Sequence, residues 1–548
     1  MVALLRSMAT PVRRFGTIAV AAVLVASVAG SGSSRAASTT HTRQSIAQHI
    51  LATRASQIMT ANARLALEAM ARAERPEAAL RTDPRFAKGI TSSGGVQAPS
   101  SSFTNVRVND PSLDTHQVDQ TTQSETTIAV SGANVVVGYN DSAQALQPFL
   151  TAGADLNGYA YSTNGGASFT DGGTIPNKQA FINLGDPWLA ADRAGNVYYS
   201  SLAIDGFSGN LDVAVAKSTN GGHTFTEPVL ASPPNALFYF GDKDALTVGR
   251  SASNASQDVL YDTWDDSACD AVSCFNGLPV ARSTDGGATW QIAYADKFTF
   301  DDTAGCSFQQ YIGAQPLVDP RNGTLYVAAE RFSVVDPNCD GGTSTMDESI
   351  FVSTDGGQTF GPRTTIASVV PAFPNGFLQL GPGLIVRTIE FPTLALFGNA
   401  LYAAWNDGTS GDSHVRLAKS TNGGRNWTLS WASQGSNDEI QPALSADASA
   451  LHLLYYQRNG DNTLDTVVAN SSNGSGFVAR TVTTHSFPGV ITVPQFDPII
   501  AFGYMGDYIA NVSDGSHAYF AWGDNRDTVT NFMWPQGRHD PNVYFAKQ

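Results

Sequence analysis

The chain of 548 residues carries a formal net charge of −16 at pH 7, and only 15% of its residues are charged. An acidic chain of this kind repels nucleic acids and anionic membrane surfaces, so neither is expected as a partner. A low charge content, 51 glycines and many Ser and Thr residues are typical of a turn-rich β protein.

Residues 1–37 have the features of a secretion signal. Arg13 and Arg14 precede an apolar run, Phe15 to Ala29, that is too short to span a membrane and ends in small residues. No later apolar stretch is long enough to cross a bilayer. We therefore expect a secreted, extracellular monomer, exported by the ordinary route rather than by twin-arginine export.

Residues 38–102 are predicted to be separate from the main domain. Ala, Gln, Arg, Leu and Met dominate residues 43–75, which predicts a helical segment that ends at Pro76. Residues 86–102 are rich in Ser and Gly and are expected to form a linker. We interpret 38–102 as a loosely attached spacer. Packing against the main domain and a role as a pro-region are the alternatives.

Five copies of one octad recur along the chain, and a degenerate sixth copy follows at Ser471–Phe477. The starts of neighbouring copies, including the sixth, are 51 to 70 residues apart, which indicates a repeat architecture. Asn or Asp at the third position tolerates a left-handed backbone, the Gly-Gly pair supplies positive φ, and the closing Phe or Trp is an apolar anchor. These features predict a structural hairpin turn. The five octads are Ser162–Phe169, Ser218–Phe225, Ser283–Trp290, Ser353–Phe360 and Ser420–Trp427.

The octad resembles the Asp-box, or BNR repeat, of the sialidase superfamily. The copies at Asp285 and Asp355 match the pattern Ser-x-Asp-x-Gly-x-Thr followed by an aromatic residue, Trp290 or Phe360, and the other three carry Asn. The resemblance covers roughly residues 103–548. It implies a β-propeller whose octads lie on the face away from the active site. It implies a glycosidase less specifically, because propellers that only bind also contain this repeat.

Residues 103–548 divide into seven units, each with four strands and with the octad between the third and fourth. This predicts an all-β propeller of seven blades, with six, the usual number in sialidase-like enzymes, as the alternative. The seventh unit stops at its third strand, so we predict that Phe103–Val108 supplies its outer strand and closes the ring. The seven first strands begin at Glu125, Asp186, Asp244, Gln315, Phe391, Gln441 and Asp507.

Four cysteines lie within one stretch of 71 residues. An even number in an exported protein favours disulfides. We expect Cys269–Cys274 to form a small loop clip and Cys306–Cys339 to bridge two loops. A metal site is the less favoured interpretation, because there is no CxxC motif and no nearby pair of histidines.

The face opposite the octads collects the first-strand starts, the second-strand ends and the long second-to-third loops, and it is where a ligand site is expected. Acids that recur at second-strand ends, Asp141, Asp266, Asp407 and Asp524, are interpreted as scaffold. The acids at the first-strand starts repel one another, which suits a general acid or a bound cation such as a structural calcium ion. The alternative is that each carboxylate caps backbone amides.

Candidate site residues are those that line this face or break the repeat. Sialidases bind sialic acid through an arginine cluster, but their Arg-Ile-Pro motif is absent here and Glu125 stands near its place. Tyr456, Tyr504 and Tyr508 are equivalent candidates for the sialidase tyrosine, so no nucleophile is assigned. The catalytic candidates are Glu125, Asp186, Asp244, Glu330 and Glu390. The substrate-binding candidates are Arg331, Arg387, Arg458, Arg526, Asp507 and Tyr508.

The leading functional hypothesis is a secreted, exo-α-sialidase-like glycoside hydrolase that acts on extracellular carbohydrate or glycoconjugates through a pair of mouth carboxylates, one protonated and one ionised. No cofactor is expected. A non-catalytic propeller that binds glycan or protein at the cell surface is the first alternative. A scaffold for an envelope assembly is the second.

Overall fold

The computed structural model describes Gln48 and residues 101–548, with gaps at 115–121, 143–154, 179–180, 206–207, 234–237, 270–272, 301–306, 337–342, 374–375, 382–383, 434, 490–504 and 531–534. The predicted signal lies outside the described residues. So does the predicted helical segment, except for Gln48. In the described part of the chain, no helix is long and apolar enough to span a bilayer.

Strands make up the regular structure of the described residues from 101 onward, apart from a 3-10 turn at Pro111–Leu113, while Gln48 is helical. Units 1 to 3 contain β2 (Gln123–Ser131), β3 (Asn134–Asp141), β4 (Asn157–Ser162), β5 (Thr170–Thr174); β6 (Phe181–Ala191), β7 (Val197–Asp205), β8 (Leu211–Ser218), β9 (Val229–Leu230); and β10 (Phe238–Arg250), β11 (Asp258–Cys269), β12 (Cys274–Ser283), β13 (Gln291–Phe300).

Units 4 to 7 follow the same plan. They contain β14 (Phe308–Val318), β15 (Leu325–Val335), β16 (Thr343–Ser353), β17 (Thr364–Ser368); β20 (Thr393–Phe397), β21 (Ala400–Asp407), β22 (His414–Ser420), β23 (Thr428–Trp431); β24 (Glu439–Ala446), β25 (Leu451–Arg458), β26 (Leu464–Ser471), β27 (Val478–Thr481); and β28 (Ala510–Ser513), β29 (Ala518–Val529), β30 (Arg538–Lys547), β1 (Val106–Arg107). A two-stranded ribbon, β18 (Phe377–Gln379) and β19 (Ile385–Arg387), precedes unit 5.

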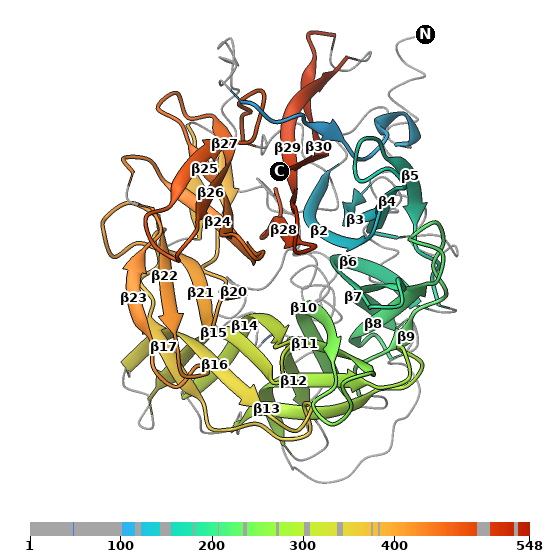
Figure 1. The fold of residues 1–548 in the computed structure, drawn as a ribbon, viewed down its shortest axis with the longest axis vertical. Helices are drawn as coiled ribbons and strands as arrows, with labels where there is room; N and C mark the ends of the chain where they lie inside the picture. Colours follow the sequence, from blue (N-terminus) through green and yellow to red (C-terminus); the bar gives the residue numbers. More distant parts are fainter. Residues whose placement is uncertain are drawn as a thin grey trace.

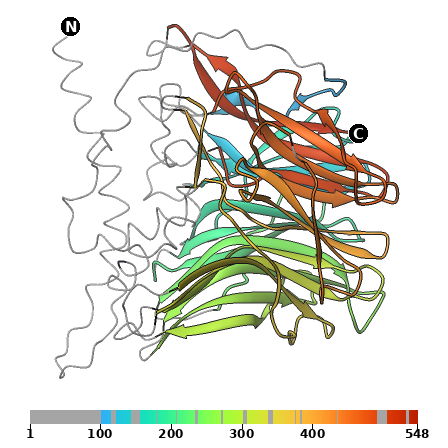
Figure 2. The same cartoon turned by 90° about the vertical axis from the view of Figure 1, so that its left-hand side faces the viewer.

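The units are antiparallel sheets arranged around a common centre (Figure 1). Units 2 and 3 join into one eight-stranded sheet through a single parallel pair, Leu211 with Phe240. The first strands contact one another in the order β2, β6, β10, β14, β20, β24, β28 and again β2. Figure 2, turned by 90°, shows the strands running across the thickness of this arrangement. Each unit therefore presents its first strand to the centre.

The outer strand of unit 7 comes from the other end of the domain. Val106 pairs with Phe545 and Arg107 with Tyr544, so β1 continues the sheet formed by β28, β29 and β30. The predicted pairing of Phe103–Val108 with the last unit is confirmed. It covers what would otherwise be an exposed sheet edge and holds the two ends of the domain together.

All five octads lie between the third and fourth strands of their units, as predicted. In the first, the Ser162 hydroxyl accepts the Gly166 N–H at 2.9 Å and donates to Asn164 Oδ1 at 2.8 Å. Equivalent bonds from the second glycine N–H to the octad serine recur in the others at 2.8–2.9 Å. Both glycines of each pair have positive φ. The turn thus satisfies its own polar groups.

The glycine pair also serves a contact that the sequence does not reveal. A Cβ on Gly166 would lie 2.2 Å from the ring of Phe545 in unit 7, and one on Gly222 would lie 2.2 Å from Val136 in unit 1. Each octad therefore packs against the preceding unit. At Gly424 the same position is 3.6 Å from Ile350, so the closeness of this contact differs between units.

The core is distributed between neighbouring sheets. One cluster combines Val135 and Val137 of unit 1 with Ala521, Val543 and Phe545 of unit 7. The second strands of three units each bury a tryptophan completely: Trp264, Trp405 and Trp522. Since each sheet buries its faces against its neighbours, the units stabilise one another and hold the first strands in place.

Candidate functional site

Four of the first strands share an unusual backbone feature on the side opposite the octads. A β-bulge interrupts the pairing of β2, β6, β10 and β24, and a non-glycine residue with left-handed φ occupies each bulge. These residues are Glu125 (φ 52°), Asp186 (56°), Lys243 (52°) and Gln441 (52°). A left-handed conformation is unfavourable for such residues and is retained where the surrounding structure imposes it, often at functional sites.

Lys243 stands among these bulges and was not one of the candidates predicted from the sequence. Its ammonium lies 3.8 Å from the ring centroid of Tyr508, 4.5 Å from that of Trp188 and 5.8 Å from that of Phe391. The side chain is buried. Burial lowers the Lys243 pKa, while the nearby charges of four acids oppose that shift: Glu125, Asp244, Asp186 and Asp507. Among the bulge residues, it is the single cation.

Two of these acids, Asp507 and Glu125, are far apart in the sequence but joined by a hydrogen bond. The Asp507 N–H donates to Glu125 Oε1 at 3.1 Å, and Arg387 Nε forms an ion pair with Asp507 Oδ1 at 3.2 Å. Asn140 donates to Glu125 Oε2 at 2.7 Å and accepts the Asp186 N–H at 2.8 Å. Burial raises the pKa of Asp507 to about 7, although Arg387 opposes the shift.

A second acid pair lies beside Lys243. Ser200 of unit 2 donates its hydroxyl to Asp262 Oδ2 at 2.5 Å. Burial and the neighbouring Asp262 charge raise the pKa of Asp244 well above its ordinary value, and burial raises that of Asp262 to about 7. These carboxyl groups can hold protons at neutral pH, as a general acid must.

A third group of acids lies between units 4 and 5. Glu330 and Glu348 are directly opposite each other on β15 and β16, and Glu390 precedes β20. All three are buried. Burial, followed by the Glu330 charge, raises the pKa of both Glu348 and Glu390 well above the usual range. Glu348 was not among the sequence candidates.

The structure therefore brings together most of the predicted acids, but only one of the predicted arginines reaches them. Glu125, Asp186, Asp244, Asp507 and Tyr508 lie around Lys243, and Arg387 is paired with Asp507. Arg331 is bound to Asp347 (3.0 Å), Arg458 to Asp438 (3.0 Å) and Arg526 to Asp524. The substrate-binding role of these three arginines stays a prediction. The hydroxyl of Tyr508 donates to Pro187 O at 2.9 Å and that of Tyr456 to Gly523 O at 2.7 Å, while Tyr504 lies outside the described residues.

The acids recurring at second-strand ends have local partners, which fits the scaffold interpretation. Asp141 accepts from Gln123 at 3.0 Å and Asp266 from Tyr294 at 2.7 Å, while Asp407 accepts the Thr409 N–H. No group of three or more His, Cys, Asp or Glu within the described ranges is arranged to hold a metal ion.

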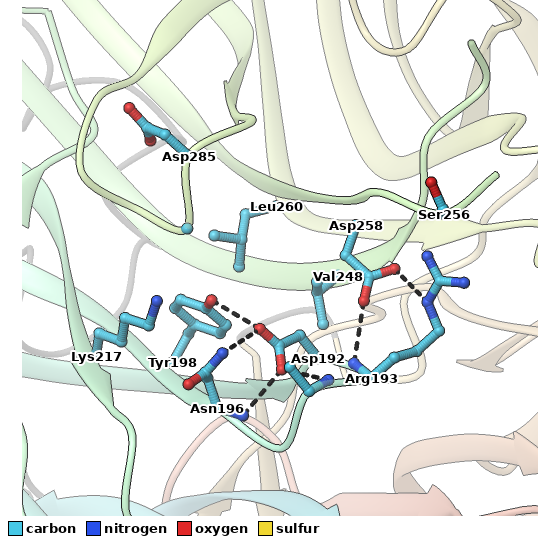
Figure 3. A pocket seen from close by; sticks show the side chains of 12 residues that line it. Asp192, Arg193, Asn196, Tyr198, Lys217, Val248, Ser256, Asp258, Leu260 and Asp285 are labelled. Carbon is cyan, nitrogen blue, oxygen red and sulfur yellow. Dashed lines mark hydrogen bonds and ion pairs between the residues drawn. The ribbon is translucent and has the colours of Figure 1, made fainter. Parts of the chain in front are cut away.

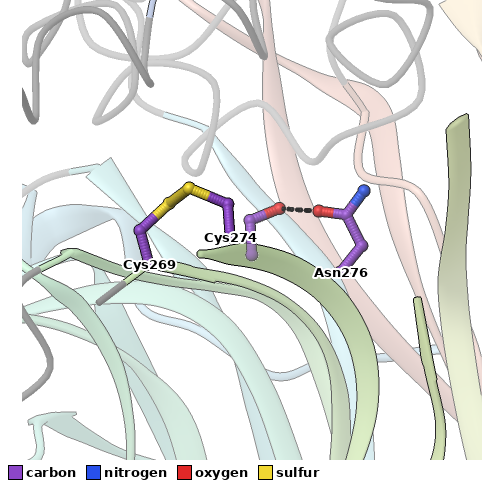
Figure 4. Close-up of a disulfide and its surroundings, with 4 residues drawn as sticks. Cys269, Cys274 and Asn276 are labelled. Atoms are coloured by element: carbon purple, nitrogen blue, oxygen red, sulfur yellow. Dashed lines mark hydrogen bonds between the residues drawn. A yellow bond between two sulfur atoms is a disulfide. The ribbon is translucent and has the colours of Figure 1, made fainter. Parts of the chain in front are cut away.

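The predicted disulfide Cys269–Cys274 is confirmed (Figure 4). It joins the end of β11 to the start of β12, on the side away from the octads, and a Ser267–Asn276 hydrogen bond of 2.7 Å follows it in the same hairpin. The predicted bridge Cys306–Cys339 lies outside the described residues. The confirmed disulfide fixes a second-to-third connection at the end of unit 3 where Lys243 lies.

A pocket of about 470 Å³ lies elsewhere, between units 2 and 3 on the octad side (Figure 3). Lys217, Asp285 and the β6–β7 turn line it, and Asp192 in that turn accepts hydrogen bonds from Asn196 and Tyr198. Arg193 is bound to Asp258 at 2.7 Å. Its acids and Arg193 are thus engaged within the protein, and it lies at the opposite end of the strands from the bulge residues.

No protein-family model and no curated protein matches the chain. Solved structures with a similar fold include the phage phi92 endosialidase (TM-score 0.41, 10% identity, covering 82% of this chain and 69% of that one) and a Trypanosoma rangeli sialidase in complex with the inhibitor DANA (0.38, 14%, 69% and 60%). A third is the α-L-arabinofuranosidase Arb93A from Fusarium graminearum (0.37, 9%, 82% and 98%). The chain spans less than two thirds of the trypanosomal protein. Similarities at this level do not assign a function.

Proposed function

We propose that the chain is a secreted seven-bladed β-propeller that hydrolyses glycosidic bonds at the end of its axis marked by the left-handed bulges. One observation carries this proposal: carboxyl groups from units 1, 2, 3 and 7 converge around Lys243, where burial raises the pKa of Asp507 to about 7 and that of Asp244 well above its ordinary value. Glycoside hydrolysis commonly requires two carboxyl groups in different protonation states on either side of the scissile bond.

Asp507 is the residue we assign as general acid. With a pKa of about 7, a large fraction of its carboxyl groups carries a proton at neutral pH, and Arg387 stabilises the carboxylate left after proton transfer. Glu125 is its partner, acting as base or nucleophile. Hydrogen bonds from the Asp507 N–H and from Asn140 fix the orientation of both Glu125 oxygens.

The test is hydrolysis of a panel of aryl glycosides, including a sialoside, a glucosaminide and an arabinofuranoside, by the full chain. We expect turnover of at least one substrate and a loss of kcat of about 10²- to 10⁴-fold in Asp507→Asn and Glu125→Gln. Asp285→Asn is the matched control, because this carboxylate lies in an octad at the other end of the sheets and three octads carry Asn there.

If the wild-type protein hydrolyses none of these glycosides but binds glycan measurably, the proposed hydrolase activity is refuted and the non-catalytic binding propeller is favoured. Wild-type turnover that Asp507→Asn leaves unchanged would refute the assignment of the acid but not the activity.

A further inference from the structure

Glu348 is a buried carboxyl group without a partner. Neither of its oxygens has a hydrogen-bond partner, and the side chain is fully buried on β16. It lies opposite Glu330 on β15, so two acids occupy one cross-strand position. An unpaired buried carboxyl group is destabilising unless it is protonated or meets a positive charge.

The neutral side chain of Asn406, beside the glutamates, also has a buried atom without a hydrogen-bond partner. The Asn406 amide is fully buried, and its Nδ2 group donates to Thr388 at 3.4 Å and to Glu390 at 3.5 Å. Its Oδ1 atom has no partner. The two carboxyl oxygens of Glu348 and the Asn406 Oδ1 atom thus lack hydrogen-bond donors. A ligand that fits this place must supply hydrogen-bond donors and positive charge.

Lys243 demonstrates which chemistry this end of the molecule accommodates. Its ammonium lies over the rings of Tyr508, Trp188 and Phe391, and the charges of nearby carboxylates favour its protonated form. Phe391 directly follows Glu390, so the glutamate group adjoins the ring set that holds Lys243. An ammonium group brings three donors and one charge. The acids of the described residues are not arranged to hold a metal ion, which favours an amine over a metal.

We infer that Glu330, Glu348 and Glu390 form a binding site for a protonated primary amine of the ligand. Resting on the proposed function, this makes the substrate class an amine-bearing glycan, such as a glucosamine oligomer. This charge preference is opposite to that for an anionic sugar, which the sialidase resemblance implies would be bound by an arginine cluster. Three of the four predicted arginines are instead bound to acids of their own unit.

Binding of a cation here is coupled to proton release. Burial and mutual repulsion raise the pKa values of Glu348 and Glu390, which favours their protonated forms in the free protein. An ammonium group favours the ionised carboxylates and displaces those protons. A neutral sugar that only donates hydrogen bonds displaces none. Proton release therefore distinguishes the proposed site from ordinary glycan binding.

The experiment is isothermal titration calorimetry of the full chain at pH 7 in two buffers of different ionisation enthalpy. The probes are a glucosamine tetramer, its fully N-acetylated counterpart and putrescine. We expect the tetramer to bind with proton release and the N-acetylated oligomer to bind at least ten-fold more weakly. Glu348→Gln should weaken tetramer binding at least ten-fold. Glu439→Gln, which removes a buried glutamate that accepts from Ser433 in unit 6, should not.

Equal binding of the two oligomers, or tetramer binding without proton release, would overturn the inference, and neither result depends on a variant folding. Stronger binding of putrescine than of the tetramer would overturn the assignment to a glycan. Hydrolysis of neutral glycosides without amine binding would refute this site and retain the proposed enzyme. Tetramer binding with proton release but without any hydrolysis would support this site and refute the proposed enzyme.

Discussion

Replacing Lys243 with Met tests whether the central ammonium compensates the acids around it. Met keeps most of the apolar volume and contacts aromatic rings favourably, so the change mainly removes the charge. Removing one partner of a buried charge pair costs about 3–5 kcal/mol, because the other charge stays buried and uncompensated. Burial already lowers the Lys243 pKa, so burying the ammonium is itself unfavourable. The cost of the substitution therefore comes from the repulsion between carboxylates that the ammonium no longer compensates. We expect Lys243→Met to lower the free energy of unfolding by that amount at pH 7.

The effect depends on pH with a defined sign. Losing the ammonium raises the carboxyl pKa values of the folded state further, and a group whose folded pKa is raised loses stability as pH rises. Asp507, with a pKa of about 7, and Asp244 take up protons as pH falls. The difference between wild type and variant should therefore shrink towards pH 5 and grow towards pH 8.

Urea unfolding followed by tryptophan fluorescence, at pH 5, 7 and 8, measures these differences. Lys217→Met is the matched control. Lys217 also lies over a tyrosine ring, 5.3 Å from the centroid of Tyr198, but it lines the pocket on the octad side. An exposed cation–π contact contributes about 0.5–1 kcal/mol. Equal stabilities of the two variants at pH 7, or a Lys243→Met effect that is constant from pH 5 to 8, would refute the reasoning.

Three further predictions concern stability. Gly222→Ala should cost about 2–4 kcal/mol and Gly424→Ala about 1 kcal/mol, because both require left-handed φ but only the first meets a side chain at 2.2 Å; similar unfolding midpoints would contradict the packing explanation. Replacing Cys269 and Cys274 by Ser should lower the free energy of unfolding in urea by about 2 kcal/mol, as expected for a short closed loop. An unchanged unfolding midpoint would show that the disulfide does not stabilise the fold. Glu348→Gln should raise the melting temperature at pH 8 but not near pH 4, because the raised folded pKa of Glu348 removes stability as pH rises above its ordinary value of 4.5; a lower melting temperature at pH 8 would contradict the raised pKa.

Local pattern was sufficient to predict the octads and the outer strand of unit 7. The octad carries its own hydrogen bonds, from Ser162 to Gly166 for example, so its conformation follows from eight consecutive residues. The pairing of β1 with β30 follows from counting strands, since the last unit lacks one and an unpaired strand precedes the first.

The candidate site was predicted only in part, because its geometry depends on backbone irregularity and register. Lys243 was missed since an even strand pattern places the start of β10 at Asp244, whereas the bulge turns the preceding residue towards the acids. Glu348 was missed because only the pairing of β16 with β15 sets it opposite Glu330. A lysine in the place where other units have Glu, Asp or Gln was the available signal.

The sequence by itself determined the repeating unit: strand, turn, strand, loop, strand, octad and strand, since each of these depends on neighbours in the chain. Only the tertiary structure decided which charges meet. Arg387 reaches Asp507, while Arg331 binds Asp347 within its own sheet. Electrostatic and packing contacts at the centre join residues hundreds of positions apart, as in the bond between Asp507 and Glu125. Their partners are set by how the sheets pack around the axis, which no local pattern contains.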